Sequence, residues 1–398
     1  MIDFRDIKAA SDRIKGRVLR TPAVLSESLS RATGAAVVLK LDNLQATGAF
    51  KERGAANRLS LLTAEERRAG VIAVSAGNHA QAVARHASLL GIAATIVMPK
   101  FTPTTKVTRT AAWGARVVLQ GDTLAQASEH AHALSRREGL VFIHPYDDPA
   151  IIAGQGTLAL ELLQDFPDLD IMLIPTGGGG LLAGCSVVGT ALASGIQMFG
   201  VEVESYPAMA QRLENQPVSV GGATIAEGIA VQDVGEIPLS LIRVNADGVL
   251  VVPERAIEEA IGLLVEGAKV VAEGAGAAGL AALLTFPDRF HDKRVGIPVS
   301  GGNIDGRILS NVLLRNLLRD GRLLRLHLQI PDRPGVLADI AGKIGGREGN
   351  IIEVRHERLF AASSVQAAEL EIMVEARDRT HAAEIVEALA ADYTVRSV

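Results

Sequence analysis

Short runs of apolar, largely β-branched residues recur along the first three quarters of the sequence, with helical patterns between them. The runs cover residues 36–39, 70–74, 94–98, 116–119, 171–174, 198–201 and 295–299, and clear helical patterns cover residues 80–90 and 124–138. Runs that are apolar on both faces are typical of parallel strands covered by helices on both sides. The alternation therefore predicts an α/β fold with parallel strands. Ligands of such sheets bind beyond the carboxyl ends of the strands, so the loops after these runs are the candidates for chemistry.

Charge and residue counts exclude several classes of protein. The 398 residues include 40 Lys and Arg against 45 Asp and Glu, a formal net charge of −5, which argues against nucleic-acid binding and against a polybasic membrane protein. The one cysteine, Cys185, allows no disulfide framework or thiolate metal cluster within the chain. His130 and His132 lie close together, but the nine histidines show no metal-ligand spacing. We therefore expect no metal site. The first residues lack the features of a signal peptide, so we expect a cytoplasmic protein.

One stretch needs a separate interpretation because it is long enough to span a membrane. Residues 171–201 contain no charged side chain. Pro175 and the glycines at 177–180 would break a lipid-exposed helix near its start. We therefore interpret the stretch as a buried strand, a loop and a buried helix.

The pattern changes after residue 320. Strand-like segments at 323–330, 351–357, 366–375 and 393–398 alternate with helical patterns at 336–347 and 380–391. The order strand–helix–strand–strand–helix–strand is that of a ferredoxin-like α+β domain. We expect a second, small domain at residues 323–398.

The first candidate loop is residues 47–55 (TGAFKERGA), where Lys51 stands beside Phe50 just before a predicted helix. Most single lysines are solvated surface groups. A helix N-terminus disfavours a cation, however, so we expect the pKa of Lys51 to be lowered. An amine that loses its proton readily can attack an aldehyde.

The second candidate loop is residues 75–81 (SAGNHAQ), which follows a strand and opens a helix. We expect Ser75 to cap this helix and the free backbone N–H groups to form an anion site. Asn78 and His79 add side-chain donors. A capped turn with a structural histidine would explain the same residues.

The third candidate loop is residues 175–181 (PTGGGGL), between a strand and a helix. Its four glycines would let the backbone approach a phosphate and direct N–H groups toward it. A rival interpretation is a dinucleotide fingerprint formed by Gly178, Gly180 and Ala183, with Glu202 at the end of a strand about 20 residues further on. Pro207 and the late position in the chain weaken that interpretation.

The fourth candidate loop is residues 299–303 (VSGGN), which places Ser300 at the carboxyl end of a strand. Taken alone, it could be a glycine-rich turn. A phosphate cradle, an activated lysine, a carboxylate-binding turn and a serine at a strand end nevertheless form one coherent set. That set suits pyridoxal phosphate and an amino-acid substrate.

With these residues in place, the chain resembles the fold-type-II pyridoxal-phosphate enzymes, the tryptophan-synthase β fold, and the threonine dehydratases (threonine ammonia-lyases) in particular. The motifs that carry the resemblance are residues 47–55, 75–81, 144–149 (HPYDDP), 152–157 (IAGQGT), 177–181, 227–231 (EGIAV), 273–277 (EGAGA) and 300–303. The resemblance implies a catalytic domain over residues 1–320. Its large lobe would comprise about 1–45 and 146–320, and its small lobe about 46–145.

The resemblance also implies roles for single residues. Lys51 would carry the cofactor on its amine and then act as the catalytic base, with Phe50 beside the ring. Asn78 would hydrogen-bond the 3′-oxygen of the ring, and Ser300 would face the pyridine nitrogen. The phosphate would be bound by the backbone of Gly177, Gly178, Gly179, Gly180 and Leu181. The substrate carboxylate would be held by Ser75, Ala76 and His79.

The implied reaction is the conversion of L-threonine to 2-oxobutanoate and ammonia, with L-serine giving pyruvate as a side activity. Ser300 offers a hydroxyl where a carboxylate would keep the ring nitrogen protonated, so elimination is expected rather than transamination. The implied role is the first step of isoleucine biosynthesis. A catabolic dehydratase that isoleucine does not inhibit is the alternative.

The last segment resembles an ACT regulatory domain, through residues 332–337 (DRPGVL) and 349–351 (GNI). Such domains pair through their sheets and often bind amino-acid effectors. The implied regulatory residues are Asp332, Pro334, Gly335, Asn350 and Ile351. The effector could be isoleucine, valine, a nucleotide or none, and a domain that only dimerises stays open. A homo-oligomer, dimer or tetramer, is expected, while a monovalent cation has no decisive motif.

Three rival classes of protein are disfavoured. Serine racemases share most motifs, but they carry a serine where this chain has Ala76, and a metal-binding carboxylate pair of which only Glu202 is matched, since Ala208 stands at the second position. A nicotinamide-dependent oxidoreductase built on the Gly178 motif leaves Lys51 unexplained. A non-catalytic amino-acid sensor is opposed by the intact Lys51.

Overall fold

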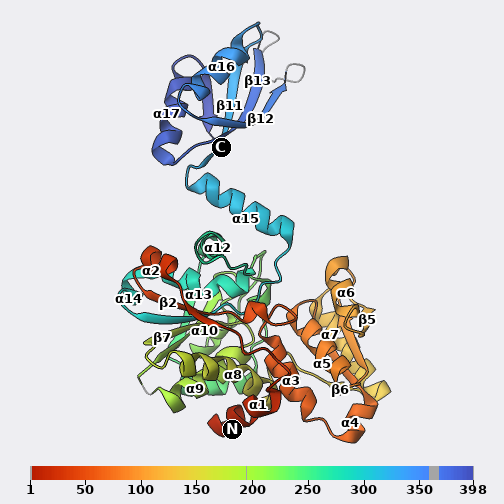
Figure 1. The fold of residues 1–398 in the computed structure, drawn as a ribbon. Helices are drawn as coiled ribbons and strands as arrows, with labels where there is room; N and C mark the ends of the chain where they lie inside the picture. Colours follow the sequence, from red (N-terminus) through yellow and green to blue (C-terminus); the bar gives the residue numbers. More distant parts are fainter. Residues whose placement is uncertain (1, 194, 358–366, 398) are drawn as a thin grey trace. The chain divides into compact units, whose positions relative to one another are not determined.

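The computed structural model describes residues 2–193, 195–357 and 367–397, which form two compact units (Figure 1). The units are Met1–Ile304 and Asp305–Val398. The second unit begins with helix α15 (Gly306–Arg319), whereas the sequence predicted a boundary after residue 320. The reason for the difference is that α15 contacts strand β11 of the second unit.

The large lobe of the first unit is built on a six-stranded sheet in the order β1-β2-β10-β7-β8-β9. Its strands are β1 (Ala23–Leu25), β2 (Ala36–Lys40), β7 (Ile171–Pro175), β8 (Gln197–Val203), β9 (Gly248–Val252) and β10 (Arg294–Pro298). All neighbouring strands are parallel except β1, which pairs antiparallel with β2. The predicted parallel α/β fold is confirmed, and the short edge strand β1 is an addition that the alternation did not predict.

Helices pack around this sheet (Figure 1). They are α1 (Phe4–Ile14), α2 (Glu27–Thr33), α8 (Pro149–Asp165), α9 (Gly180–Leu192), α10 (Ala208–Leu213), α11 (Glu236–Asn245), α12 (Glu254–Leu263), α13 (Gly274–Thr285) and α14 (Pro287–Phe290), with short turns η1 (Asp42–Leu44), η2 (Glu227–Ile229) and η3 (Leu264–Ala268). Strand β7 and residues 180–189 of α9 are buried, which explains the uncharged stretch at 171–201. No helix in the described part of the chain is long and apolar enough to cross a membrane.

The small lobe is a four-stranded parallel sheet in the order β5-β4-β3-β6. Its strands are β3 (Val71–Val74), β4 (Ala94–Met98), β5 (Arg116–Leu119) and β6 (Val141–Phe142), and its helices are α4 (Ala64–Ala69), α5 (Asn78–Leu89), α6 (Thr104–Ala111) and α7 (Leu124–Glu138). Helix α3 (Lys51–Ser60) contacts both α5 of this lobe and α8 of the large lobe. It therefore joins the two lobes.

A buried group of charged side chains fixes α3 to the large lobe. Arg53 of α3 donates to Asp42 Oδ2 at 2.6 Å and to Glu161 Oε1 of α8 at 2.8 Å. Lys40, at the end of β2, donates to Glu161 Oε2 at 2.6 Å. Lys40, Asp42 and Arg53 have no exposed surface. Two cations and two carboxylates thus satisfy one another where water does not reach, as buried charges require.

The second unit confirms the predicted ferredoxin-like plan. Its antiparallel sheet has the order β12-β13-β11-β14, and α16 and α17 pack on the buried face of that sheet. The elements are β11 (Leu323–Pro331), α16 (Val336–Gly345), β12 (Asn350–Glu357), β13 (Ala367–Glu375), α17 (Arg379–Ala390) and β14 (Thr394–Ser397). The predicted strand positions 366 and 398 lie outside the described residues.

We predict that Asp42→Asn lowers the free energy of unfolding by about 3 kcal/mol, because it leaves the buried Arg53 without a charged partner. Burial alone would raise the pKa of Asp42, but Arg53 holds that pKa below its usual value. The carboxylate therefore stabilises the fold above pH about 4. The difference in free energy of unfolding between wild type and variant narrows as the pH falls below that value. Denaturant titration at several pH values measures this.

The matched control is Asp165→Asn, which breaks the exposed ion pair with Arg20. It should lower the free energy of unfolding by less than about 1 kcal/mol. Equal losses in the two variants would contradict a special role for the buried network.

Candidate active site

Lys51 begins helix α3, and its side chain is partly buried. Its Nζ donates to the carbonyl oxygen of Pro145 at 2.8 Å and lies 5.3 Å from the centre of the Phe50 ring. Burial lowers the pKa of Lys51 to about 8. The lowered pKa agrees with the prediction, and loss of water is a cause that the sequence did not reveal. A substantial share of neutral amine near neutral pH is what attack on an aldehyde requires.

The loop before Lys51 is fastened to the loop that carries Ser300. The N–H of Phe50 donates to the carbonyl of Ser300 at 2.9 Å, and the N–H of Gly302 donates to the carbonyl of Gly48 at 2.9 Å. Ser300 is 3% exposed. The first and fourth predicted loops therefore form one rigid layer, although some 250 residues separate them in the sequence.

Asn78, at the start of α5, joins this layer through its side chain. Its Oδ1 accepts from Asn303 Nδ2 at 2.8 Å, and its Nδ2 donates to Glu273 Oε1 at 2.6 Å. One N–H of Asn78 has no partner among the described residues and is available to a ligand. The sequence placed Asn78 at the site but gave no role to Asn303 or Glu273, because their motifs carried no chemical signal by themselves.

The neighbouring residues of this loop differ from expectation in two ways. Ser75 does not cap α5, because its hydroxyl accepts from the N–H of Gly77 at 3.0 Å inside the loop. The His79 ring is buried, and its Nε2 lies 3.0 Å from the carbonyl of Ile143. Since a carbonyl only accepts, Nε2 carries the proton and Nδ1 is an acceptor without a partner in the described residues.

The electrostatics of His79 support this tautomer. Burial, together with the nearby Lys51, lowers the pKa of His79 to about 3, so the ring is neutral. A neutral ring whose single N–H is already used cannot donate to a carboxylate. Around this loop, the donors left for a substrate carboxylate are the Ser75 hydroxyl and the backbone N–H groups, including that of Ala76.

The glycine loop ends at the N-terminus of α9. The described residues offer no hydrogen-bond partner to the backbone N–H groups of residues 177–182. These free donors at a helix N-terminus form an anion site. Glycine is required at two of these positions for a further reason, lack of space for a side chain, which the sequence did not reveal. A Cβ on Gly178 would lie 2.4 Å from the Tyr146 ring, and one on Gly179 would lie 2.4 Å from Met209.

Residues 144–147 connect the glycine loop with Lys51. Pro145 accepts from Lys51, and Tyr146 packs on Gly178 while its hydroxyl donates to the carbonyl of Asp233 at 2.7 Å. Asp147 accepts from the N–H of Ile237 at the start of α11 at 3.0 Å. This segment therefore joins the first and third predicted loops, while Asn303 joins the second and fourth loops to the first.

The dinucleotide interpretation is wrong. Glu202, which would have to face a ribose, has no exposed surface. Its two oxygens accept from the N–H groups of Met209 and Ala210 at 2.8 and 2.9 Å. The described residues also contain no cluster of three or more His, Cys, Asp or Glu side chains able to hold a metal ion.

One ion pair across the lobes was not predicted. Lys106 of α6, in the small lobe, donates to Glu227 of η2, in the large lobe, at 2.6 Å. Both charges influence the pKa of Glu273, so the pair lies near the loops that carry Asn78 and Ser300. Glu227 belongs to a motif that the sequence identified, but a contact between distant lobes leaves no periodic signal.

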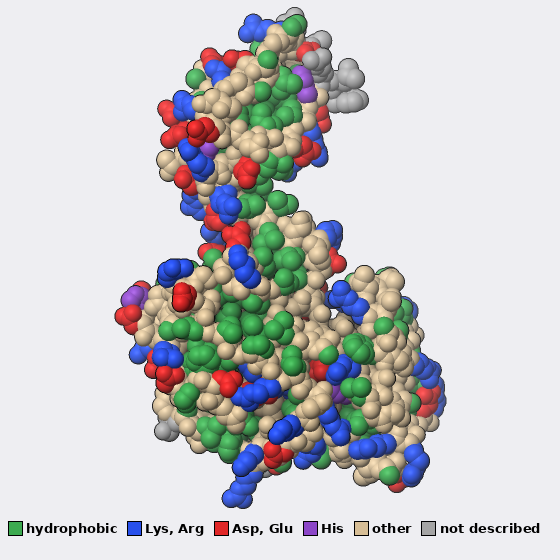
Figure 2. Space-filling view, in the orientation of Figure 1, with side chains coloured by type: hydrophobic (Ala, Val, Ile, Leu, Met, Phe, Trp, Pro, Cys, Tyr) green, Lys and Arg blue, Asp and Glu red, His purple; other side chains and the backbone are tan. Residues whose placement is uncertain are grey.

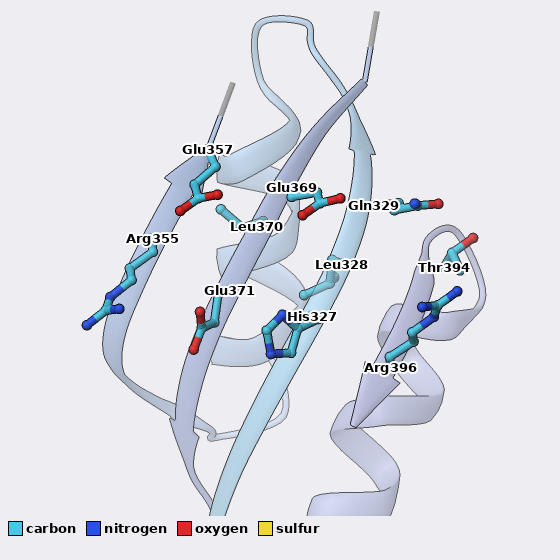
Figure 3. A pocket seen from close by; sticks show the side chains of 10 residues that line it. All are labelled: His327, Leu328, Gln329, Arg355, Glu357, Glu369, Leu370, Glu371, Thr394 and Arg396. Carbon is cyan, nitrogen blue, oxygen red and sulfur yellow. The ribbon is translucent and has the colours of Figure 1, made fainter. Parts of the chain in front are cut away.

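The second unit has a depression of about 360 Å³ on the face of its sheet (Figure 3). Its charged lining consists of His327, Arg355, Glu357, Glu369, Glu371 and Arg396. None of the predicted regulatory residues lines this depression. Asp332, Pro334 and Gly335 precede α16, whereas Asn350 and Ile351 follow it. Ten helical residues span about 15 Å, so the two groups lie at opposite ends of α16.

Comparisons with known proteins agree with this site. The family model described as "Pyridoxal-phosphate dependent enzyme" matches residues 14–301. The chain belongs to this family of pyridoxal-phosphate-dependent enzymes.

Among its relatives, the L-threonine ammonia-lyase of Thermotoga maritima is 41% identical over the full length of both chains. The processed form of threonine deaminase isoform 2 from Solanum lycopersicum is 35% identical, with a TM-score of 0.74 over 79% of this chain and 87% of that chain. Maize serine racemase is 34% identical, with a TM-score of 0.74 over 80% and 98%.

The residues present fit pyridoxal phosphate. The unpartnered N–H groups at the start of α9 suit a phosphate, the partly buried amine of Lys51 suits an aldehyde, and the free N–H of Asn78 suits a ring oxygen. The family shows the cofactor.

We predict that Gly178→Ala weakens cofactor binding by about tenfold or more, because the added Cβ collides with Tyr146 and displaces the phosphate-binding amides. Equilibrium titration of the cofactor-free protein with pyridoxal phosphate measures the affinity. Gly195→Ala is the control, since a Cβ there meets no atom within 4 Å. An unchanged affinity in Gly178→Ala would show that the glycine loop does not bind the phosphate.

Proposed function

We propose that this enzyme converts L-threonine to 2-oxobutanoate and ammonia, with conversion of L-serine to pyruvate as a side activity. The observation that carries the proposal is the partly buried amine of Lys51, which has a lowered pKa and is held by the segment that packs on the glycine loop. The relatives named L-threonine ammonia-lyase and threonine deaminase support the same substrate.

The roles of the chain's own residues follow from their chemistry. Pyridoxal phosphate, when bound, supplies the sink for the electron pair of the substrate α-carbon. The Lys51 amine takes the α-proton, and as an ammonium it can return a proton to the departing β-hydroxyl. The Ser75 hydroxyl and the backbone N–H groups around Ala76 hold the substrate carboxylate. The buried Ser300 hydroxyl faces the ring nitrogen without a charge.

Elimination is favoured over racemisation by one side chain. Racemisation needs a second proton carrier on the face opposite Lys51, and the position after Ser75 is Ala76, which carries no exchangeable proton. Glu202 is occupied by the backbone of α10, which also removes it from metal binding. Both observations favour a dehydratase.

The biological role that we propose is the first step of isoleucine biosynthesis in the cytoplasm, with the second unit as an ACT regulatory domain that binds an amino-acid effector. The ferredoxin-like topology of that unit supports this role. Since the residues expected to bind the effector lie at opposite ends of α16, a site that joins them requires two copies of the unit. A catabolic enzyme without isoleucine control is the alternative.

We propose a homo-oligomer, supported by apolar side chains that one chain leaves exposed. Leu19, Leu25, Leu44 and Val271 are 45–51% exposed on neighbouring segments of the large lobe. Hydrogen bonds from Leu19 to Gln45 and from Asn43 to Val271 tie the segments of Leu19, Leu44 and Val271. A bond from the N–H of Leu41 to the carbonyl of Pro22 ties in the start of β1, the strand that carries Leu25. Hydrophobic side chains gather over this lobe in Figure 2. Clustered exposed apolar groups are typical of protein interfaces.

The test of the function is the rate of 2-oxobutanoate formation from L-threonine by the cofactor-loaded protein, with and without isoleucine. We expect turnover of threonine, slower turnover of serine and inhibition by isoleucine, while Lys51→Ala loses activity because no amine remains to move the proton. Turnover that isoleucine does not change would favour the catabolic role. No turnover of either amino acid would contradict the dehydratase.

We predict that Leu25→Glu shifts the oligomer toward the monomer, because a carboxylate placed in the exposed apolar patch would have to be buried in the interface. Sedimentation velocity at several protein concentrations measures the mass. Leu89→Glu is the control, since Leu89 is 62% exposed on α5 of the small lobe, away from the patch. An unchanged mass of Leu25→Glu would place the interface elsewhere.

A further inference from the structure

The orientation of the Asn303 amide follows from a backbone carbonyl. Asn303 Nδ2 lies 2.7 Å from the carbonyl oxygen of Thr47, four residues before Lys51. A carbonyl oxygen can only accept a hydrogen bond, so the atom of Asn303 that faces it is the amide nitrogen. The same nitrogen donates to Asn78 at 2.8 Å. Asn78 therefore presents its oxygen to Asn303.

The orientation of Asn303 fixes that of Asn78 in turn. The amide nitrogen of Asn78 points toward Glu273, whose Oε1 accepts a hydrogen bond from it at 2.6 Å. The nitrogen has two hydrogens, and Glu273 takes one of them. The other N–H is left for the cofactor ring. Without an acceptor at Glu273, only the Asn303 hydrogen bond to its oxygen holds the Asn78 amide, and the amide is freer to rotate away from the ring.

Glu273 is itself held firmly. It precedes helix α13, and its backbone N–H donates to the carbonyl of Gly301 at 3.0 Å. Its carboxylate lies so close to the Gly301 backbone that a Cβ on Gly301 would be 2.3 Å from Oε1. Glu273 thus contacts both Asn78 and the loop that carries Ser300.

We propose that Glu273 is a positioning residue, which holds the Asn78 amide so that one N–H faces the 3′-oxygen of the pyridoxal ring. The proposal rests on the proposed function, and on the placement of Asn78 beside the ring that the family resemblance implies. It gives the EGAGA motif at residues 273–277 a chemical role, which neither its composition nor its position in the sequence indicated.

The charge state of Glu273 supplies a second readout. Burial raises its pKa to about 7, against the opposing influence of Asn78, Lys106 and the N–H of Asn303, while Glu227 raises it further. The ionised carboxylate is the stronger acceptor for Asn78. The hydrogen bond to the ring oxygen is therefore best defined above pH about 7, and the absorbance of the bound cofactor should titrate near that pH.

The test compares Glu273→Gln and Glu273→Ala with wild type, by equilibrium titration with pyridoxal phosphate and by pH titration of the bound cofactor's absorbance. Glu273→Gln keeps an acceptor oxygen for Asn78, so we expect near wild-type affinity and loss of the inflection near pH 7. Glu273→Ala removes the acceptor, so we expect affinity to fall by about tenfold or more and the spectrum to change. Glu129→Gln, at an exposed carboxylate of α7, is the charge control.

A second variant tests the same contact without changing the carboxyl group. Gly301→Ala adds a Cβ that would lie 2.3 Å from Glu273 Oε1 and 3.2 Å from Asn78 Nδ2, so it disturbs the contact from both sides and should reproduce the spectral change of Glu273→Ala. Wild-type affinity and spectrum in both Glu273→Ala and Gly301→Ala would overturn the proposal. These readouts do not use turnover, so they separate failure of this inference from failure of the threonine assignment.

Discussion

The first unit depends on the pairing of one buried cation. Arg53 has no exposed surface, and its guanidinium is held by Asp42 on one side and Glu161 on the other. These partners come from the turn after β2 and from α8, so the pairing fixes α3 against the large lobe. Lys51 stands on the same helix, two residues earlier. The position of the reactive amine is therefore set by an ion network that does not touch the substrate.

Two of the cations of α3, Lys51 and Arg53, also show how one helix can carry opposite electrostatic environments. Burial opposes the charge on both side chains. Beside Arg53, two carboxylates overcome that effect and raise its pKa. Among the described residues, the Lys51 amine has a carbonyl oxygen as its one hydrogen-bond partner, and burial lowers its pKa to about 8. The carboxylates beside Arg53 keep that side chain a cation, whereas no carboxylate in the described part of the chain pairs with Lys51, so its amine can lose its proton.

The sequence predicted those features that depend on local pattern. Apolar runs located the strands, and the loops after them supplied Lys51, Asn78, the glycines and Ser300, because parallel strands bring their carboxyl ends to one edge. It failed where a role depends on a partner far along the chain. The donor state of His79 depends on the Ile143 carbonyl, and the orientation of Asn78 depends on residues 195 and 225 positions away. The glycines at 178 and 179 are required as much by Tyr146 and Met209 as by a phosphate.

The second unit extends this argument beyond a single chain. Its topology was readable from strand and helix order, but its proposed effector site was not, since α16 separates the two groups of expected ligands. Strand β12 lies at the edge of the sheet, with Ile352 and Val354 exposed on it. An edge strand with unpaired backbone and exposed apolar side chains favours pairing with a second copy. In the proposed enzyme, association and effector binding would then be one structural event, which links regulation to the oligomer.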